Sequence, residues 1–172
     1  TVQRVLVVVD MQNDFINGSL SNPDAEKIIP FIEKEIVSNK YDEVIFTQDT
    51  HISDYLNTQE GQNLPVEHCI YGTHGWQIVD SLNKYVKDNT ICKTTFGYTN
   101  WLNEYFHFKN VKEIVVVGTC TDICVVSNVL ILKATYPEIK ITVLSQGCAG
   151  LTIEKHNAAL EVMKSCQVNV ID

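Results

Sequence analysis

The sequence predicts a three-layer α/β/α protein built on a mainly parallel six-stranded sheet. Short apolar, β-branched runs such as RVLVVV and IVVV are typical of strands that are buried on both faces. Segments with helical spacing of apolar residues separate these runs, and such alternation is typical of a parallel sheet with helices on both faces. A length of 172 residues suffices for a sizeable core, so residues 1–172 are expected to form a single domain.

The first strand and the helix after it are defined by a change of spacing. Residues 4–9 form a continuous apolar strand that ends at Asp10, and residues 11–20 form a loop rich in Asn and Gly. Asp24 can cap the following helix, whose isoleucines fall on one face. Because Pro30 lies within that helix, the helix is predicted either to kink at this residue or to begin there.

Two further strands lie on either side of a long irregular segment. Residues 43–47 (EVIFT) form the second strand, and residues 90–92 form a short third one. Between them, residues 51–75 have no regular spacing, and a loop of that length in a compact domain is usually functional or disordered. Its tyrosines and histidines favour a functional segment, and a short helix over residues 76–85 is predicted to follow it.

The second half of the chain alternates regularly between helical and strand patterns. The predicted elements are, in order, a helix over 99–106, a strand over 114–117, a helix from Thr121 to Leu132, a strand over 139–144, a helix over 152–166 and a final strand over 168–171. Each crossover between parallel strands is thus supplied by a helix, as a parallel sheet requires.

The composition excludes some partners. A net charge of −8 argues against nucleic acid or an anionic membrane as a partner, because both favour a basic face. No apolar run approaches the roughly 18 residues of a membrane span, and the first residues show no signal-peptide pattern. We therefore expect a cytoplasmic protein whose six cysteines are reduced thiols.

Polar side chains follow four of the predicted strands directly. They are Asp10, Asp49 with His51, Lys93 and Cys124. In a parallel sheet, ligands bind beyond the carboxyl ends of the strands, near the point where the strand order reverses. The alternative interpretation is that a polar residue after a buried strand only marks the point where the chain reaches water. Their occurrence together, beside a cysteine at a helix start, favours a site.

Cys124 is the candidate nucleophile. It falls in the first turn of a helix after a buried strand, where the helix dipole and unpaired N–H groups favour a thiolate. Asp10 could take its proton, Lys93 could stabilise both charges, and backbone N–H groups of residues 118–124 could bind an oxyanion. The alternatives are a buried structural thiol, or a redox pair with Cys120 whose CxxxC spacing is unlike that of thioredoxin.

Asp49, His51 and His68 form a candidate metal site. Two ligands two residues apart on an extended segment point the same way, and the long loop returns a third. Glu60 lies between the histidines as a further candidate ligand. This Asp/His/His set favours a divalent metal, zinc above all, with manganese or iron as alternatives. The competing interpretation is that His51 and His68 are loop histidines hydrogen-bonded to backbone.

Three motifs resemble those of the isochorismatase-like cysteine hydrolases, and the resemblance covers nearly the whole chain. They are VVVDMQNDF, KTTFG and VVVGTCTDICV. The resemblance implies that Asp10, Lys93 and Cys124 are the catalytic residues. It also implies a cis peptide between Thr119 and Cys120, so that the backbone N–H groups of Cys120 and Cys124 form the oxyanion hole.

Within that family, QDTH and LPVEHCIYGTHG are similar to the metal segment of the nicotinamidases. This implies conversion of nicotinamide to nicotinate and ammonia through a thioester, as a step of NAD salvage. The metal would bind the pyridine nitrogen and waters, Cys124 would attack the carboxamide carbon, and Phe15 would flank the ring. Family members often assemble as homo-oligomers, although the sequence shows no interface signature.

The sequence departs from the nicotinamidase pattern at Pro65. Many nicotinamidases carry an aromatic residue, often Trp, just before the metal-binding His, whereas this chain has LPVEH. Tyr55, Tyr71 or Trp101 could supply the missing wall of the pocket. Two other functions therefore stay open: a related hydrolase acting on another small amide, or a non-catalytic metal-binding or thiol redox protein.

Overall fold

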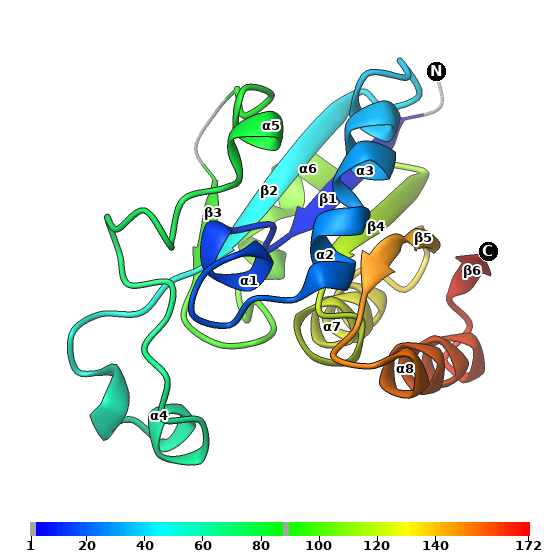
Figure 1. Cartoon of the computed structure of the whole chain (residues 1–172). Coiled ribbons are helices and arrows are strands. Elements are labelled where there is room, and N and C mark those ends of the chain that lie inside the picture. Colours follow the sequence, from blue (N-terminus) through cyan, green and yellow to red (C-terminus); the bar gives the residue numbers. More distant parts are fainter. Residues whose placement is uncertain (1–2, 88–89) are drawn as a thin grey trace.

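The structure, a computed structural model, describes residues 3–87 and 90–172 and contains a six-stranded, wholly parallel sheet (Figure 1). The strands are β1 (Arg4–Val9), β2 (Glu43–Asp49), β3 (Ile91–Lys93), β4 (Glu113–Thr119), β5 (Lys140–Ala149) and β6 (Asn169–Ile171). Their order is β3-β2-β1-β4-β5-β6, and all five pairings are parallel. The predicted fold class and all six strands are confirmed.

Side chains of the central strands alternate between two cores. Val5, Val7 and Val9 of β1 face a core that they share with helices on one side of the sheet. Leu6 and Val8 face the opposite core. This alternation follows from the two-residue period of a strand. Residues 5–9 of β1 are all apolar because both faces of the strand are buried.

Helices complete the outer layers (Figure 1). The face of Val5 is covered by α6 (Tyr105–Phe108), α7 (Val126–Thr135) and α8 (Ile153–Ser165). The face of Leu6 is covered by α2 (Pro23–Lys27), α3 (Ile29–Ile36) and α5 (Asp80–Asn83). None of the helices in the described part of the chain is long and apolar enough to cross a membrane.

The predicted helix at Asp24 is in fact two helices. The chain breaks at Ile28, so Pro30 lies in the first turn of α3, where its missing N–H costs nothing. Asp24 was wrong as the cap: Asn22 caps α2 by accepting a hydrogen bond from the backbone N–H of Asp24. The predicted loop over 11–20 also contains one helical turn, α1 (Asn13–Ile16).

The other helical predictions need smaller corrections. The long segment after β2 contains η1 (Tyr55–Asn57) and α4 (Gln59–Asn63), and Figure 1 shows it extending away from the end of β2. The helix predicted over 76–85 is only the short α5. The helix predicted over 99–106 begins as a 3₁₀ turn, η2 (Trp101–Glu104), and continues as α6.

The chain after β4 differs most from the prediction. Before α7 it forms a π-helical turn, η3 (Thr121–Val125), in which the Val125 N–H donates to the Cys120 carbonyl at 3.0 Å. Cys124 therefore lies in a widened turn, ahead of the α-helix rather than in its first turn. Such π-helical turns are frequent at functional sites.

The strand order reverses between β1 and β4. The chain builds β1, β2 and β3 toward one edge, then returns to the other side of β1 with β4. The carboxyl ends of β1 and β4 flank this switch point, and they carry Asp10 and the Cys124 turn. This is the place where the topology of parallel sheets predicts a ligand site.

Candidate active site

Asp10 and Lys93 form a buried ion pair at the carboxyl ends of β1 and β3. The Nζ of Lys93 lies 2.6 Å from Oδ2 of Asp10, and both side chains are almost fully buried. The Thr47 hydroxyl donates to the other carboxylate oxygen, Oδ1, at 2.7 Å. Asp10 itself has a positive φ of 52°, which is uncommon outside glycine and turns the carboxylate out of the strand direction. The structure thus brings the first and third predicted strand ends together.

The charges of this pair influence each other strongly. Burial raises the pKa of Asp10, and the nearby Asp49 carboxylate raises it further, against the lowering effect of Lys93. Burial lowers the pKa of Lys93, but the negative groups around it, Asp10 first, raise it above its ordinary value. Lys93 therefore stays protonated, whereas Asp10 is a carboxyl group prepared to exchange a proton.

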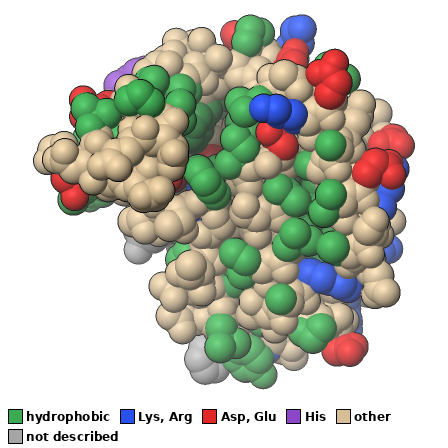
Figure 2. All heavy atoms as spheres, turned by 90° about the horizontal axis from the view of Figure 1, so that it is seen from below, with side chains coloured by type: hydrophobic (Ala, Val, Ile, Leu, Met, Phe, Trp, Pro, Cys, Tyr) green, Lys and Arg blue, Asp and Glu red, His purple; other side chains and the backbone are tan. Residues whose placement is uncertain are grey.

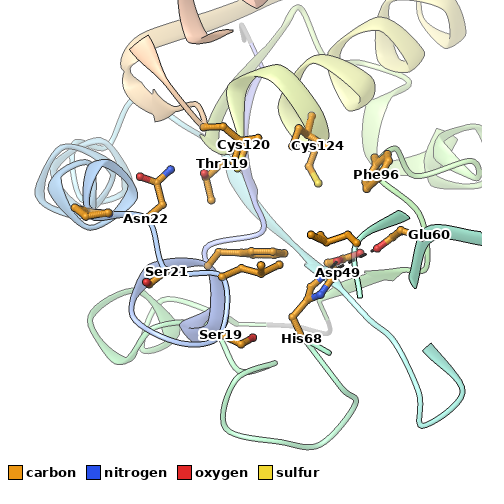
Figure 3. Close-up of a pocket in the computed structure, with 16 residues that line it drawn as sticks. Ser19, Ser21, Asn22, Asp49, Glu60, His68, Phe96, Thr119, Cys120 and Cys124 are labelled. Atoms are coloured by element: carbon orange, nitrogen blue, oxygen red, sulfur yellow. Dashed lines mark ion pairs between the residues drawn. The ribbon is translucent and has the colours of Figure 1, made fainter. Parts of the chain in front are cut away.

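Cys124 faces the same site from the π-helical turn. Its side chain is 6% exposed and lines a pocket, and Figure 3 shows its sulfur pointing into that pocket. Burial raises the pKa of the Cys124 thiol, as does the Asp10 carboxylate, while Lys93 lowers it. Burial thus works against the thiolate that the helix start was predicted to favour, and Cys124 lies ahead of α7 rather than in its first turn. A buried neutral thiol needs a base, and Asp10 is beside it.

The backbone between β4 and Cys124 has little freedom. Gly118 has φ +128°, and a Cβ there would lie 2.2 Å from the carbonyl oxygen of Val9 in the neighbouring strand. The Thr119–Cys120 peptide is cis. The Cys120 carbonyl accepts from two N–H groups of the turn, at 3.0 Å each, and the Thr119 hydroxyl donates to the Ala149 carbonyl. The turn is therefore fixed relative to β1 and β5.

Asp49, His51, Glu60 and His68 form a second cluster, and their ligand atoms all lie within 4.8 Å of one another. The Oδ2 of Asp49 lies 2.9 Å from Nε2 of His51 and 3.4 Å from Nε2 of His68. The Oε2 of Glu60 lies 3.4 Å from Nε2 of His51 and 3.8 Å from Nε2 of His68. All four residues predicted as candidate ligands are thus brought together.

The hydrogen bonds behind this cluster suit a metal site. Nδ1 of His68 donates to the Val66 carbonyl at 2.8 Å, which orients the ring so that Nε2 faces Asp49 and Glu60. Burial raises the pKa of Asp49, but its bonds to His51 and His68 outweigh this and hold the pKa below its ordinary value. Oδ1 of Asp49 is buried without a hydrogen-bond partner. Two imidazoles and two carboxylates fit a borderline divalent cation, while Oδ1 of Asp49 lies 3.8 Å from Nζ of Lys93.

Gln12 connects the cluster of candidate metal ligands to the sheet, and its role was not predicted from the sequence. Its side-chain amide donates to the Asp49 carbonyl at 2.8 Å and accepts from the Asp49 N–H at 2.9 Å, as a neighbouring strand would. It also donates to the Trp76 carbonyl, and it is fully buried. The available signal was its place in VVVDMQNDF, two residues after Asp10, where a buried amide needs partners for both of its polar atoms.

One pocket of about 500 Å³ connects the two clusters. Cys124, Cys120 and Thr119 line it from one side, and Asp49, Glu60 and His68 line it from the other (Figure 3). Phe15 also lines it, with its ring centroid 5.6 Å from that of His68. In Figure 2, a hollow separates the lobe that carries α4 from the rest of the molecule, and hydrophobic side chains surround it.

None of the three aromatic residues predicted as a substitute wall lines this pocket. Tyr55 is fully buried behind the metal cluster, with its ring 4.7 Å from that of His51. Tyr71 is exposed and packs on Trp76, and Trp101 is buried in the core. The apolar wall is instead formed by Phe96 and Leu64, together with Leu20, Ile123 and Leu151. Phe96 lies in the KTTFG motif, three residues after Lys93, so its position near the site could have been inferred.

With this geometry, the similarity of the chain to known proteins becomes informative. Residues 4–172 match the isochorismatase domain. The chain belongs to the isochorismatase family. Its relatives include a nicotinamidase of Schizosaccharomyces pombe, 25% identical over 96% of this chain and 91% of that protein.

Two further proteins are similar to this chain over most of their length. A protein of Arabidopsis thaliana described as a probable inactive nicotinamidase is 28% identical, over 95% of this chain and 89% of that protein. The crystal structure of a pyrazinamidase of Pyrococcus horikoshii in complex with zinc is 25% identical, covers 99% of each chain and has a TM-score of 0.81. The chain is thus similar to the nicotinamidase subgroup of its family.

Proposed function

We propose that this protein is a metal-dependent cysteine amidohydrolase that converts nicotinamide to nicotinate and ammonia. One observation carries the proposal: a buried thiol with its own carboxylate base opens into the same pocket as an Asp/His/Glu/His cluster. The nicotinamidases among its relatives support the substrate. Recycling of nicotinamide into NAD in the cytoplasm is the process that this activity would serve.

The reaction begins with transfer of a proton from the Cys124 thiol to Asp10. The sulfur then forms a bond to the carboxamide carbon, and the carbonyl electrons move to oxygen. When the carbonyl re-forms, the C–N bond breaks and Asp10 returns its proton to the leaving nitrogen, which departs as ammonia. The raised pKa of Asp10 suits both tasks, since the group must accept and release a proton near neutral pH.

Hydrolysis of the thioester completes the cycle. Asp10 takes a proton from a water molecule as the water oxygen adds to the thioester carbon. The C–S bond then breaks, and Asp10 passes the proton to the Cys124 sulfur. The N–H groups of Cys120 and Cys124 would hold the oxyanion in both steps. Lys93 keeps its charge throughout, 2.6 Å from Asp10, and offsets the negative charge that appears on the carboxylate or the sulfur.

Asp49, His51 and His68 would hold the metal, with Glu60 as a further ligand. When bound, a divalent ion supplies a Lewis acid that can take the ring nitrogen of the substrate. Zinc is the favoured metal, because imidazole with carboxylate is a common zinc donor set and a related pyrazinamidase binds zinc. Phe15 would flank the ring, and Phe96 would face it in place of the missing tryptophan wall.

Ammonia release tests this proposal directly. The purified protein, loaded with zinc, is incubated with nicotinamide, pyrazinamide and several linear amides. Release from nicotinamide with little from the linear amides supports the proposal. Release from linear amides alone identifies a different amidase of the same family. No release, with formation of a Cys120–Cys124 disulfide under mild oxidation, identifies a thiol redox protein. The test is needed because one relative of similar identity is described as probably inactive.

A further inference from the structure

Asn128 is a fully buried polar residue that the proposed reaction does not use. It lies on α7, one helical turn after Cys124. Its amide nitrogen, Nδ2, donates to the carbonyl of Cys124 at 2.8 Å and to the carbonyl of Phe96 at 3.2 Å. Its oxygen, Oδ1, accepts from the backbone N–H of Tyr98 at 2.8 Å and from the indole N–H of Trp101 at 3.0 Å.

These four partners leave the amide no alternative orientation. Two of them are N–H groups that can only donate, and the other two are carbonyls that can only accept. A flipped amide would place its nitrogen against two donors and its oxygen against two acceptors. Every hydrogen-bonding position of the side chain is therefore used, which is the condition under which a buried polar residue fixes a single local arrangement.

The partners belong to two parts of the site that are distant in sequence. Cys124 carries the nucleophile on the π-helical turn. Phe96 and Tyr98 belong to the segment after β3, in which Phe96 lines the pocket. The same segment supplies the Thr95 carbonyl that accepts from Nζ of Lys93 at 3.1 Å. Asn128 thus connects the turn that carries the sulfur with the loop that holds the pocket wall and contacts the catalytic-site lysine.

We infer that Asn128 is a positioning residue, which sets the separation between the Cys124 sulfur and the Phe96 wall. The inference rests on the proposed amidohydrolase function for its kinetic consequences. Its geometric content, the placement of the thiol relative to the loop, does not depend on the substrate. Misplacement of a nucleophile by about 1 Å can cost about 100-fold in rate, so this bond network has a large expected effect.

The test replaces Asn128 by leucine, which has a similar shape and removes all four hydrogen bonds. The control is Thr135→Val, which removes a hydroxyl bond to the Ile131 carbonyl on the same helix, away from the pocket. Two readouts are compared: kcat and KM for ammonia release, and the rate at which iodoacetamide alkylates Cys124. For Asn128→Leu we expect kcat to fall by about 100-fold, KM to rise, and the alkylation rate to change at least about five-fold. Thr135→Val should leave all three within about two-fold.

A merely structural role predicts something different. Asn128→Leu would then lower the melting temperature, while the folded protein would keep the wild-type kcat, KM and alkylation rate within about two-fold, and this result would overturn the inference. If the wild-type protein releases no ammonia from nicotinamide, the proposed function fails, but the alkylation rates of the two variants still decide the role of Asn128.

Trp101→Phe provides a milder variant in case Asn128→Leu does not fold. It removes only the hydrogen bond that the indole N–H donates to the Asn128 oxygen, and it keeps an aromatic ring in the core. Its control is Tyr136→Phe, which removes a hydroxyl bond to the Trp101 carbonyl in the same aromatic cluster and leaves Asn128 untouched. We expect Trp101→Phe to lower kcat by about three- to ten-fold, in line with the loss of one hydrogen bond. Equal kinetics for the two variants would contradict the inference.

Discussion

At the carboxyl end of the sheet, the side chains of Lys93 and Asp10 pair with 1% and 0% of their surface exposed, whereas Arg4 and Glu113 at the amino end pair with 31% and 15% exposed. The distances are alike, 2.6 Å and 2.8 Å. Burial raises the pKa of Asp10, with a further rise from Asp49. Burial also raises the pKa of Glu113, but hydrogen bonds from Thr142 and Arg4 outweigh it and lower the pKa overall.

The difference lies in burial and in the neighbouring groups, because each carboxylate has a close donor on both of its oxygens. Both oxygens of Glu113 have close donors, Arg4 at 2.8 Å and Thr142 at 2.5 Å, so it stays ionised and contributes to stability. Asp10 has donors at similar distances, Lys93 at 2.6 Å and Thr47 at 2.7 Å, but it is fully buried, and the Asp49 carboxylate and the Cys124 thiol lie close to it. The two ion pairs therefore differ in role. Only the buried Asp10–Lys93 pair, with a second carboxylate and a thiol beside it, favours proton exchange.

The strongest test of this contrast is Cys124→Ala. Loss of the nucleophile should lower kcat by about 10⁴-fold or more, because Asp10 then has no Cys124 thiol beside it to deprotonate. The control is Cys148→Ala, since Cys148 is equally buried but lies on β5 and does not line the pocket. Both variants should keep the wild-type circular dichroism spectrum and bind zinc. Ammonia release by Cys124→Ala at more than a hundredth of the wild-type rate would contradict the mechanism.

Lys93→Met and Arg4→Met compare the two ion pairs directly. Lys93→Met leaves Asp10 buried without its cation, so we expect unfolding free energy to fall by about 3–5 kcal/mol and kcat by about 1000-fold. Arg4→Met should cost about 1 kcal/mol or less and leave kcat unchanged, because its pair is partly solvated. Urea denaturation and ammonia release measure both effects. Equal losses of stability would show that burial does not distinguish the two ends.

The metal cluster extends the comparison to the long segment after β2. His51→Ala should weaken zinc binding by at least about 100-fold and raise KM, because it removes a ligand from a preformed set. His74→Ala is the matched control, since His74 is exposed on the same segment and outside the cluster. Zinc content after dialysis against a chelator provides the measurement. Unchanged zinc content in His51→Ala would remove this histidine from the site.

The smallest predicted effect is a pH dependence of stability at the amino end. Since the pKa of folded Glu113 lies below its ordinary value of 4.5, its pairing stabilises the folded state above pH 4.5. That contribution is lost as the pH falls through the folded pKa. Wild type should therefore exceed Glu113→Gln in unfolding free energy by about 1 kcal/mol at pH 7, and the difference should shrink as the pH falls below 4.5 and through the folded pKa. A difference that does not depend on pH would refute the pairing.

The sequence was sufficient for the sheet and for bringing together the candidate residues at its carboxyl end. Continuous apolar runs identify strands buried on both faces, and the carboxyl ends of parallel strands share one edge. Asp10, Lys93 and Cys124 could therefore be placed together from the sequence alone. The spacing of Asp49 and His51 predicted the cluster of candidate metal ligands. These inferences succeed because strand period and sheet topology are properties of the local pattern.

Other features depend on contacts between distant residues and could not be predicted. The π-helical turn was not predicted, because it precedes α7 and no regular helical turn lies before it against which a change of spacing would show. The motif places Phe96 near the site, but no local pattern reveals the hydrogen bond from Asn128 to the Phe96 carbonyl, which joins residues 32 positions apart. The raised pKa of the thiol likewise follows from burial, which the helix-start argument did not include.

Rapid acid quenching during the first turnover of nicotinamide, followed by mass spectrometry of the peptides, tests the central claim most directly. The mechanism predicts one nicotinoyl group on the peptide that contains Cys124, absent from Cys124→Ala and lost as nicotinate appears. Full turnover with no adduct at any time, or an adduct carried by Cys120 instead, would contradict the assignment of Cys124 as the nucleophile.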